Sequence, residues 1–259
     1  MQLNLPCNMT TLNRDEFKRA ALAWTTISEK YKEVERLIPT SNIFEFDADQ
    51  VQWLNEKNKG NEFCAEVGVY DGQLILIFCP LDERGNEIEQ EEYAFSRLAQ
   101  CGGDIRLVET KQYTVVKHAV LSNDLQKIDD NSNTYFPVAN VPVLEQDKVV
   151  AAIESWRNEG MDWFYNESKK YEQTKQRNIF ERFYVPSEDV SRTESGKTLD
   201  RVICSFGLKY SAIFQQTLVT LIFISYYKED KLESGVGASV EMISNTYDWS
   251  RPCPPICKL

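Results

Sequence analysis

One stretch of the chain has the pattern of a long antiparallel β-hairpin, and it constrains the fold more than any other feature. In residues 65–87 an alternating strand contains Gly68, a turn follows at Asp71-Gly72, and an apolar strand runs from Leu74 to Phe78. An Asp-Gly pair between two such strands is typical of a type I′ turn. Because the return strand is apolar on both faces, we expect it at the centre of a sheet.

A second stretch, residues 204–233, repeats this order around Gly207. An alternating strand, a turn, an apolar return strand at residues 217–227 and a charged turn follow one another as before. A tryptophan-bearing helix is expected before each hairpin, with Trp53 before the first and Trp156 before the second. Two explanations stay open, namely a shared ancestral unit and the general likeness of antiparallel hairpins.

Residues 13–38 carry the clearest helix signal. Asn13 followed by Glu16 is a capping-box pattern, and Pro39 ends the segment. Between them apolar residues recur in a heptad rhythm, at Phe17, Ala20, Trp24, Ile27, Tyr31, Val34 and Ile38. This stripe predicts a helix that lies along the core of its own chain, with a dimeric coiled coil as the alternative.

Shorter signals complete the predicted order of elements. Asp47 opens a second helix with the same kind of cap. Residues 91–103 end in glycine and predict a short helix, and residues 104–121 predict one long strand or a hairpin. Residues 145–186 are mostly helical in pattern, with Gly160 as an expected break or kink.

These elements predict an α+β fold in which helices pack on antiparallel, hairpin-based sheet. Residues 122–142 are polar and rich in turn residues, so we place a boundary there. The chain then forms two related lobes, residues 1–140 and residues 141–259, the second of which ends in an extended tail of proline and cysteine.

The charge of the chain restricts its partners. Asp and Glu total 40 against 29 Lys and Arg, which gives a net charge of −11, and no basic run offsets it. Such a surface repels phosphate backbones and anionic lipids, so we predict no nucleic-acid and no membrane binding. An acidic surface favours solubility, and it can also attract a basic protein partner. The stripe on the first helix leaves open whether the protein is a monomer or a homodimer.

Several features predict a cytoplasmic protein. The start, MQLNLPCNMTTLNRDEF, has neither a basic nor an apolar signal region, and the longest apolar run, residues 218–227, is half of what a membrane-spanning helix needs. The seven cysteines are an odd number. Four of them, Cys64, Cys79, Cys101 and Cys204, lie in or beside apolar stretches, which predicts buried thiols and no disulfide framework.

The sequence has none of the usual signatures of catalysis. His118 is the single histidine, and hydrolytic triads and most catalytic zinc sites need at least one histidine with ordered partners. The pattern VVKHAV predicts that His118 lies on a strand, half-buried or exposed, with a general base as the alternative. Residues 194–198, ESGKT, look like the end of a phosphate-binding loop, but Ser191 stands where that loop requires its first glycine. Carboxylates gather in polar runs, at residues 87–93 and 126–131. We therefore predict no catalytic residue, no cofactor and no metal site.

The chain ends in YDWSRPCPPICKL, where Cys253 and Cys257 bracket a pair of prolines. Residues before proline favour extended geometry, and four residues of polyproline II span about 12 Å, beyond the ~7 Å limit of a disulfide. We expect an extended, unbridged tail that docks on the body of the protein through Trp249, Cys253, Ile256 and Cys257. Thiol chemistry or a disulfide, and a metal site, are the alternatives.

Part of the sequence resembles a group of uncharacterised small bacterial proteins. The resemblance lies in ERFYVPSEDV at residues 181–190, in the glycine-bearing hairpin after it and in the ending PCPPIC, and it extends over residues 145–259. It implies an α+β architecture with a CPPxC end and a bacterial origin. Because that group has no assigned activity, the resemblance implies nothing about chemistry.

Together these features favour a non-enzymatic, cytoplasmic binding or protein-interaction protein of unassigned specificity. The alternative is an enzyme or small-ligand binder whose site is assembled between the lobes from carboxylates, cysteines and aromatic side chains. A site of that kind leaves no local sequence motif, so the three-dimensional structure is needed to distinguish the two classes of function.

Overall fold

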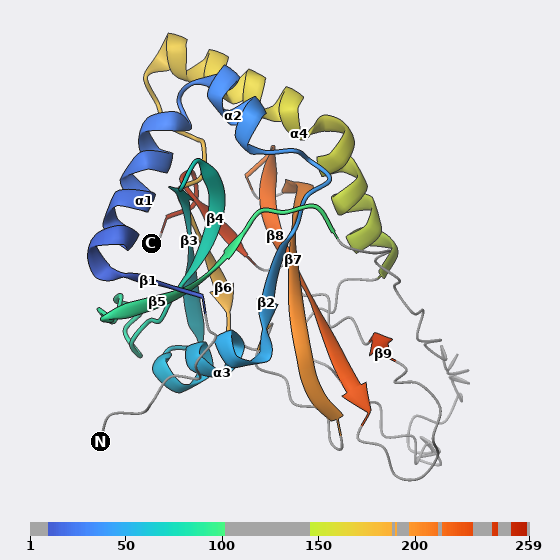
Figure 1. The fold of residues 1–259 in the computed structure, drawn as a ribbon. Coiled ribbons are helices and arrows are strands. Elements are labelled where there is room, and N and C mark those ends of the chain that lie inside the picture. Colours follow the sequence, from blue (N-terminus) through green and yellow to red (C-terminus); the bar gives the residue numbers. More distant parts are fainter. Residues whose placement is uncertain are drawn as a thin grey trace, which may run out of the picture.

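The computed structural model describes residues 10–101, 146–187, 190, 197–211, 214–229, 240–242 and 250–257. The helices are α1 (Arg14–Ile27), α2 (Tyr31–Leu37), α3 (Ala48–Lys57) and α4 (Gln146–Thr174). The strands are β1 (Thr11–Asn13), β2 (Phe44–Asp47), β3 (Glu62–Tyr70), β4 (Gln73–Cys79), β5 (Glu92–Arg97), β6 (Arg182–Pro186), β7 (Lys197–Ser211), β8 (Gln216–Glu229), β9 (Val240–Met242) and β10 (Arg251–Cys253). Figure 1 shows their arrangement.

The strands form two antiparallel sheets, with the orders β1-β5-β4-β3-β6-β10 and β2-β7-β8-β9. The β3–β4 and β7–β8 hairpins lie at the centres of these sheets, as their apolar strands predict. Asp71 and Gly72 both have positive φ, 50° and 73°, which fits the predicted type I′ turn. The predicted α+β fold with helices on hairpin-based antiparallel sheets is confirmed.

The two sheets exchange a strand. Apart from the short helices α2 and α3, α1 is followed by β2, β3, β4 and β5, and α4 is followed in the same way by β6, β7, β8 and β9. The first strand of each series joins the hairpin of the other series, since β2 pairs with β7 and β6 pairs with β3. Each sheet therefore takes strands from both sides of the predicted boundary at residue 140, which itself lies outside the described residues.

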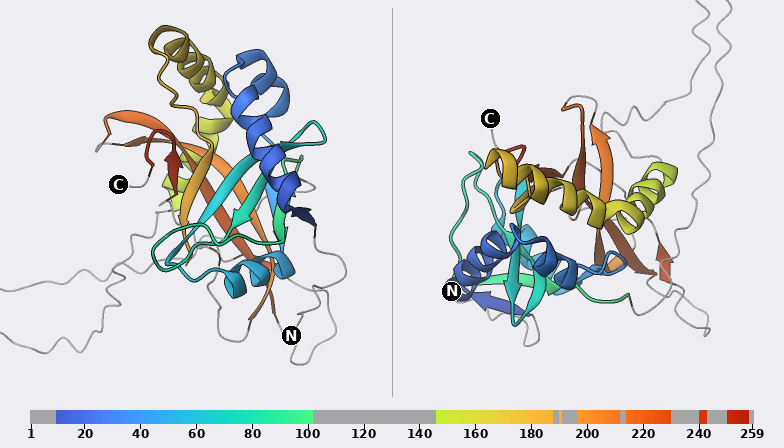
Figure 2. Two further views of the ribbon diagram at one scale, coloured as in Figure 1. Left: turned by 90° about the vertical axis from the view of Figure 1, so that its left-hand side faces the viewer. Right: turned by 90° about the horizontal axis from the view of Figure 1, so that it is seen from above.

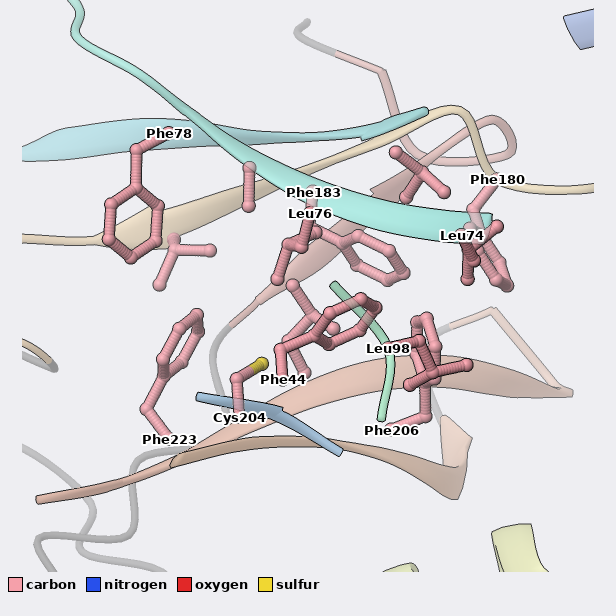
Figure 3. Packing of buried hydrophobic residues seen from close by; sticks show 14 of the residues in the cluster. Phe44, Leu74, Leu76, Phe78, Leu98, Phe180, Phe183, Cys204, Phe206 and Phe223 are labelled. Carbon is pink, nitrogen blue, oxygen red and sulfur yellow. The ribbon is translucent and has the colours of Figure 1, made fainter. Parts of the chain in front are cut away.

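The largest group of buried side chains lies between the two sheets. Figure 3 shows Leu74, Leu76 and Phe78 of β4 facing Phe206 of β7 and Phe223 of β8. Burial of each large apolar side chain of this kind contributes about 1.5–3 kcal/mol. On the outer faces, α1 covers the first sheet and the first half of α4 covers the second, so the layers run helix, sheet, sheet, helix (Figure 1).

A glycine lets each of these helices approach its sheet closely. A Cβ atom placed on Gly68 of β3 would lie 3.1 Å from the Cβ of Ala20 on α1. A Cβ atom placed on Gly207 of β7 would lie 3.3 Å from the Cβ of Ala152 on α4. The two glycines on which the hairpins were matched by sequence thus hold the same position, on the outer face under a helix.

Each covering helix carries a buried tryptophan four residues after the alanine that meets the glycine. Trp24 of α1 and Trp156 of α4 both pack edge to face on Phe164, with ring centroids 6.4 Å and 6.0 Å away. α3, which carries Trp53, does precede the first hairpin as expected. The helix that packs on the outer face of that hairpin is, however, α1.

Both predicted capping boxes are present. The side chain of Asn13 accepts a hydrogen bond from the N–H of Glu16 at 2.9 Å, and that of Asp47 accepts one from Gln50 at 2.8 Å. In each box the side chain at the third helical position returns a bond to the cap backbone. These local contacts start α1 and α3 where the sequence predicts.

A single helix over residues 13–38 is wrong, because the chain turns between α1 and α2. The N–H of Lys30 donates to the carbonyl of Ile27 at 2.8 Å, which tightens the chain into this turn. The turn brings both Trp24 and Val34 into the core between the sheets. The predicted burial of the apolar stripe against its own chain is confirmed for these residues.

Two other local predictions are also wrong. Residues 92–97 form β5 instead of a helix, and its residues alternate between the two faces, with Tyr93 toward α1 and Ala94 toward the core. Pairing with β1 and β4 outweighs the local helix signal. α4 continues through Gly160 without a break, and a Cβ there would lie 3.0 Å from the Trp156 ring, so this glycine makes room for the indole.

Some sequence predictions lie outside the described residues. These are the strand or hairpin at residues 104–121 with His118, the boundary at residues 122–142, Ser191 in the loop resemblance, and Trp249 in the tail.

Candidate functional site

The tail docks on both sheets. β10 adds to the edge of the first sheet beside β6, with Pro252 buried. The N–H of Leu221 on β8 donates to the Oγ of Ser250 at 2.6 Å, which ties the start of the tail to the second sheet. An edge strand of this kind uses backbone groups that would otherwise face solvent.

Cys253 and Cys257 are joined by a disulfide, with their Cα atoms 4.5 Å apart. The prediction of unbridged, extended geometry is therefore wrong beyond β10. It assumed trans prolines, whereas the two proline peptide bonds after Cys253 are cis, and the N–H of Ile256 closes a turn with a backbone bond of 2.8 Å. Of the four residues expected to dock the tail, Cys253 and Ile256 are half-buried, Cys257 is exposed, and Trp249 is not described.

A buried polar cluster lies on the outer face of the first sheet. Glu66 of β3 is 5 % exposed, and its Oε2 lies 2.8 Å from the Nε of Arg182 on β6. The Sγ of Cys64 lies 3.9 Å from the same oxygen, and Cys79 is opposite Cys64 in the β3–β4 register. Burial raises the pKa of Glu66 to about 7, an effect that the Arg182 guanidinium offsets only in part.

The thiols of this cluster are poorly suited to chemistry. Cys64 and Cys79 are fully buried, and burial raises the pKa of Cys79 well above its ordinary value. Because the thiolate is the reactive form, such a cysteine is inert at neutral pH. A carboxylate and thiols do come together here, as the alternative function requires, but they do so inside the protein.

A hollow of about 620 Å³ opens between the second half of α4 and the turn end of the β7–β8 hairpin. Figure 2 shows this hairpin, in orange, reaching past α4. Lining residues include Glu159, Asp162, Trp163 and Lys170 from α4, and Leu208, Tyr210 and Thr217 from the hairpin. The volume is that of an ordinary ligand site.

The hollow is acidic. One carboxylate oxygen of Glu167 pairs with Lys170, and the other accepts a hydrogen bond from Asn178 at 3.2 Å. The side chains of Glu159 and Asp162 are exposed, and within the described part of the chain they have no ion pair and no hydrogen bond. Among the described residues, these two carboxylates of the hollow thus have no salt-bridge partner, while the Lys170 ammonium is paired with Glu167.

Aromatic side chains form the rest of the wall. The Nε1 of Trp163 donates to the carbonyl of Thr217 at 3.0 Å, and its ring stacks on Phe180 at 6.0 Å, so the indole is fixed between helix and hairpin. Tyr210 is 64 % exposed, an unusual degree for a large ring. Carboxylates beside open aromatic faces form a site for a cation.

Comparison of the chain with protein-family models, with curated proteins and with solved structures gave no match. No cluster of histidine, cysteine and carboxylate side chains suited to a metal ion occurs among the described residues. The described helices are also too short or too polar to cross a membrane. The geometry of the hollow therefore carries the functional argument alone.

The sequence did not point to this hollow, because its two walls come from separate elements. Trp163 and Thr217 are 54 residues apart, and only the packing of α4 on the hairpin brings them together. Glu159 and Asp162 look like ordinary carboxylates on a helix surface. A usable signal was Trp163 beside the buried Phe164, since two adjacent rings cannot share one helix face.

Proposed function

We propose that the protein is a non-enzymatic binding protein whose hollow receives a basic side chain of a protein partner. The observation that carries this proposal is the combination, in one hollow, of the exposed ring of Tyr210 with the carboxylates of Glu159 and Asp162, which have no ion pair in the described part of the chain. We also propose the cytoplasm, as expected from the sequence, as its location.

The chemistry of the hollow matches a guanidinium or an ammonium group. Two carboxylates can accept charge-assisted hydrogen bonds from one such cation, and arginine can do so with both arms. The faces of Trp163 and Tyr210 add a cation–π attraction, worth about 0.5–1 kcal/mol at an exposed site. The hollow is larger than a single side chain, so a short length of the partner's backbone fits beside it.

The net charge of −11 supports the same proposal. Opposite charge on a partner raises the rate of encounter, and this attraction weakens as salt is added. Because the hollow is negatively charged like the molecule as a whole, the attraction that brings a basic partner to the protein also favours its binding in the hollow.

The described residues favour binding over catalysis. An acid–base group must be held within hydrogen-bond reach of the reacting atoms, usually by a second group that orients it. Glu159 and Asp162 have no such partner among the described residues, and the thiols of Cys64 and Cys79 are closed to solvent. Glu167, which also lines the hollow, is oriented by its neighbours, but both of its carboxylate oxygens are already engaged, one by Lys170 and the other by Asn178.

Two labelled peptides test the proposal, one with a single arginine and one with citrulline, which has the same shape but no charge. Fluorescence anisotropy should show binding of the arginine peptide and at least fivefold weaker binding of the citrulline peptide. Asp162→Asn should weaken binding of the arginine peptide about two- to fivefold, which is the usual worth of one exposed ion pair.

Glu154→Gln is the matched control, because Glu154 is an exposed carboxylate on the same helix and does not line the hollow. This variant loses the same charge and should leave the affinity nearly unchanged. Equal affinity for the two peptides, or equal effects of Asp162→Asn and Glu154→Gln, would show that the hollow is not the binding site.

A further inference from the structure

The protein combines one disulfide with several buried thiols. The bridge between Cys253 and Cys257 lies at the surface, where Cys257 is exposed. Cys64, Cys79 and Cys204 are buried, and none of them is in a disulfide. Disulfides exposed at a protein surface are more easily reduced than buried ones and are often regulatory. In the cytoplasm, the location that we propose, disulfides are usually transient and catalytic or redox-sensing.

We infer that the Cys253–Cys257 disulfide is a thiol–disulfide exchange site that takes a dithiol as its reductant. The site lies on the edge of the first sheet, neither cysteine is among the residues that line the hollow, and the inference does not depend on the proposed binding function.

The exchange proceeds in two steps. A thiolate of the dithiol attacks the Sγ of Cys257, the Sγ–Sγ bond breaks, and Cys253 leaves as a thiolate while Cys257 is held in a mixed disulfide. The second thiolate of the dithiol then attacks its own partner sulfur and releases Cys257. Both cysteines take up a proton from water, so the protein gains two electrons and two protons, and the dithiol is left as a disulfide.

The exposure of the two cysteines favours this direction of attack. Cys257 is exposed, whereas Cys253 is half-buried in β10, which pairs with β6. An attacking thiolate needs access to the sulfur, so the difference in exposure selects Cys257 as the sulfur attacked and Cys253 as the sulfur released.

Reduction should leave β10 in place, because the contacts that dock it precede the disulfide. Ser250 bonds to the backbone of Leu221, Pro252 is buried, and the Nη2 of Arg251 lies 2.6 Å from both carboxylate oxygens of Glu62. Among the described residues, the exchange therefore frees residues 254–257, which include the half-buried Ile256.

The test uses the native, full-length protein. It is treated with excess dithiothreitol, alkylated with iodoacetamide and mapped by mass spectrometry. A second sample receives reduced glutathione, a monothiol that leaves the mixed disulfide in place, and the adduct is mapped in the same way. Protein unfolded in guanidinium chloride, in which every cysteine is labelled, is the control for alkylation.

We expect dithiothreitol to make Cys253 and Cys257 reactive while Cys64, Cys79 and Cys204 stay unlabelled, and the glutathione adduct to lie on Cys257 in large excess over Cys253. Labelling of Cys253 and Cys257 only together with the three buried cysteines would mean that the bridge opens on unfolding, as in a structural staple. That result, or an adduct mainly on Cys253, would overturn the inference.

Discussion

The β3–β4 and β7–β8 hairpins are built alike but end differently. At the turn of the first hairpin the guanidinium of Arg97 bonds to Asp71 at 3.0 Å and to Gln73 at 2.9 Å, which closes the end with side-chain contacts. At the turn of the second hairpin, Tyr210 and Phe214 remain 64 % and 47 % exposed. The same helix-on-hairpin arrangement thus produces one closed end and one open end.

This difference shows that two similarly built halves of a fold can present different surfaces at their hairpin ends. Both halves supply a helix, a glycine under that helix and a strand given to the other half. In the second half the helix runs on past the sheet and leaves a hollow against the hairpin. The predictions below test first the features that the halves share and then those that separate them.

The largest effect should come from the tryptophans of the two covering helices. Trp24→Ala and Trp156→Ala each remove a fully buried indole, and each should lower the free energy of unfolding by about 3–5 kcal/mol. Trp24→Phe should cost about 1 kcal/mol more than Trp156→Phe. The Nε1 of Trp24 donates to the carbonyl of Phe180 at 2.8 Å, whereas that of Trp156 has no partner among the described residues. Urea denaturation measures all four; equal costs for the two phenylalanine variants would contradict this account.

The next effect separates the outer faces of the two sheets. Two residues before the glycine, β3 carries the buried Glu66 and β7 carries Ser205. Because burial raises the pKa of Glu66 from 4.5 to about 7, the folded state holds its proton more tightly than the unfolded state does. The contribution of Glu66 to the free energy of unfolding is therefore greatest below about pH 4.5 and is lost as the pH rises through about 7. The free energy of unfolding changes by about 3 kcal/mol over this range.

Glu66→Gln should remove this dependence on pH, because the glutamine side chain does not titrate, while its amide oxygen can still accept a hydrogen bond from Arg182. Glu45→Gln, at an exposed carboxylate, is the control and should keep the dependence of the unaltered protein. Free energies of unfolding measured between pH 4.5 and 8 decide the matter. If Glu66→Gln and Glu45→Gln give parallel curves, Glu66 titrates as an ordinary carboxylate.

A smaller effect distinguishes the two glycines. At Gly68 the added Cβ would meet the Cβ and the backbone carbon of Ala20 at 3.1 Å and 3.2 Å, and backbone cannot move aside easily. At Gly207 the nearest atom, at 2.6 Å, is the Cδ1 of Ile222, the end of a flexible side chain. Gly68→Ala should therefore cost about 1–3 kcal/mol and Gly207→Ala less than about 1 kcal/mol. Thermal melts of both variants measure this, and the reverse order would argue against a fixed contact between α1 and β3.

The features that could be predicted from the sequence are the local ones. The boxes at Asn13 and Asp47 and the turn at Asp71-Gly72 depend on contacts within a few residues, and all three were found. Strands that are apolar on both faces also correctly predicted which strands lie at the centres of the sheets. The repeated spacing of alanine and tryptophan, Ala20 with Trp24 and Ala152 with Trp156, is a further local feature that marks the two covering helices.

The rest depends on partners far away in the chain. The pairing of β2 with β7 and of β6 with β3 joins segments more than a hundred residues apart, and no local pattern specifies it. The local pattern of residues 92–97 predicts a helix, but pairing with β1 and β4 makes this segment a strand. The geometry of the tail depended on the proline isomers, and the trans form, the usual one, was the wrong assumption.

Titration of the protein with the arginine peptide, followed through the indole N–H signals in ¹⁵N NMR spectra, tests the central claim most directly. Trp163 lines the hollow, whereas Trp24 is buried with its indole N–H bonded to Phe180. The account predicts that the Trp163 signal shifts and saturates with the added peptide while the Trp24 signal stays in place. Binding of the peptide that shifts Trp24, or that leaves Trp163 unmoved, would contradict the claim that the open end of the second hairpin is the binding site.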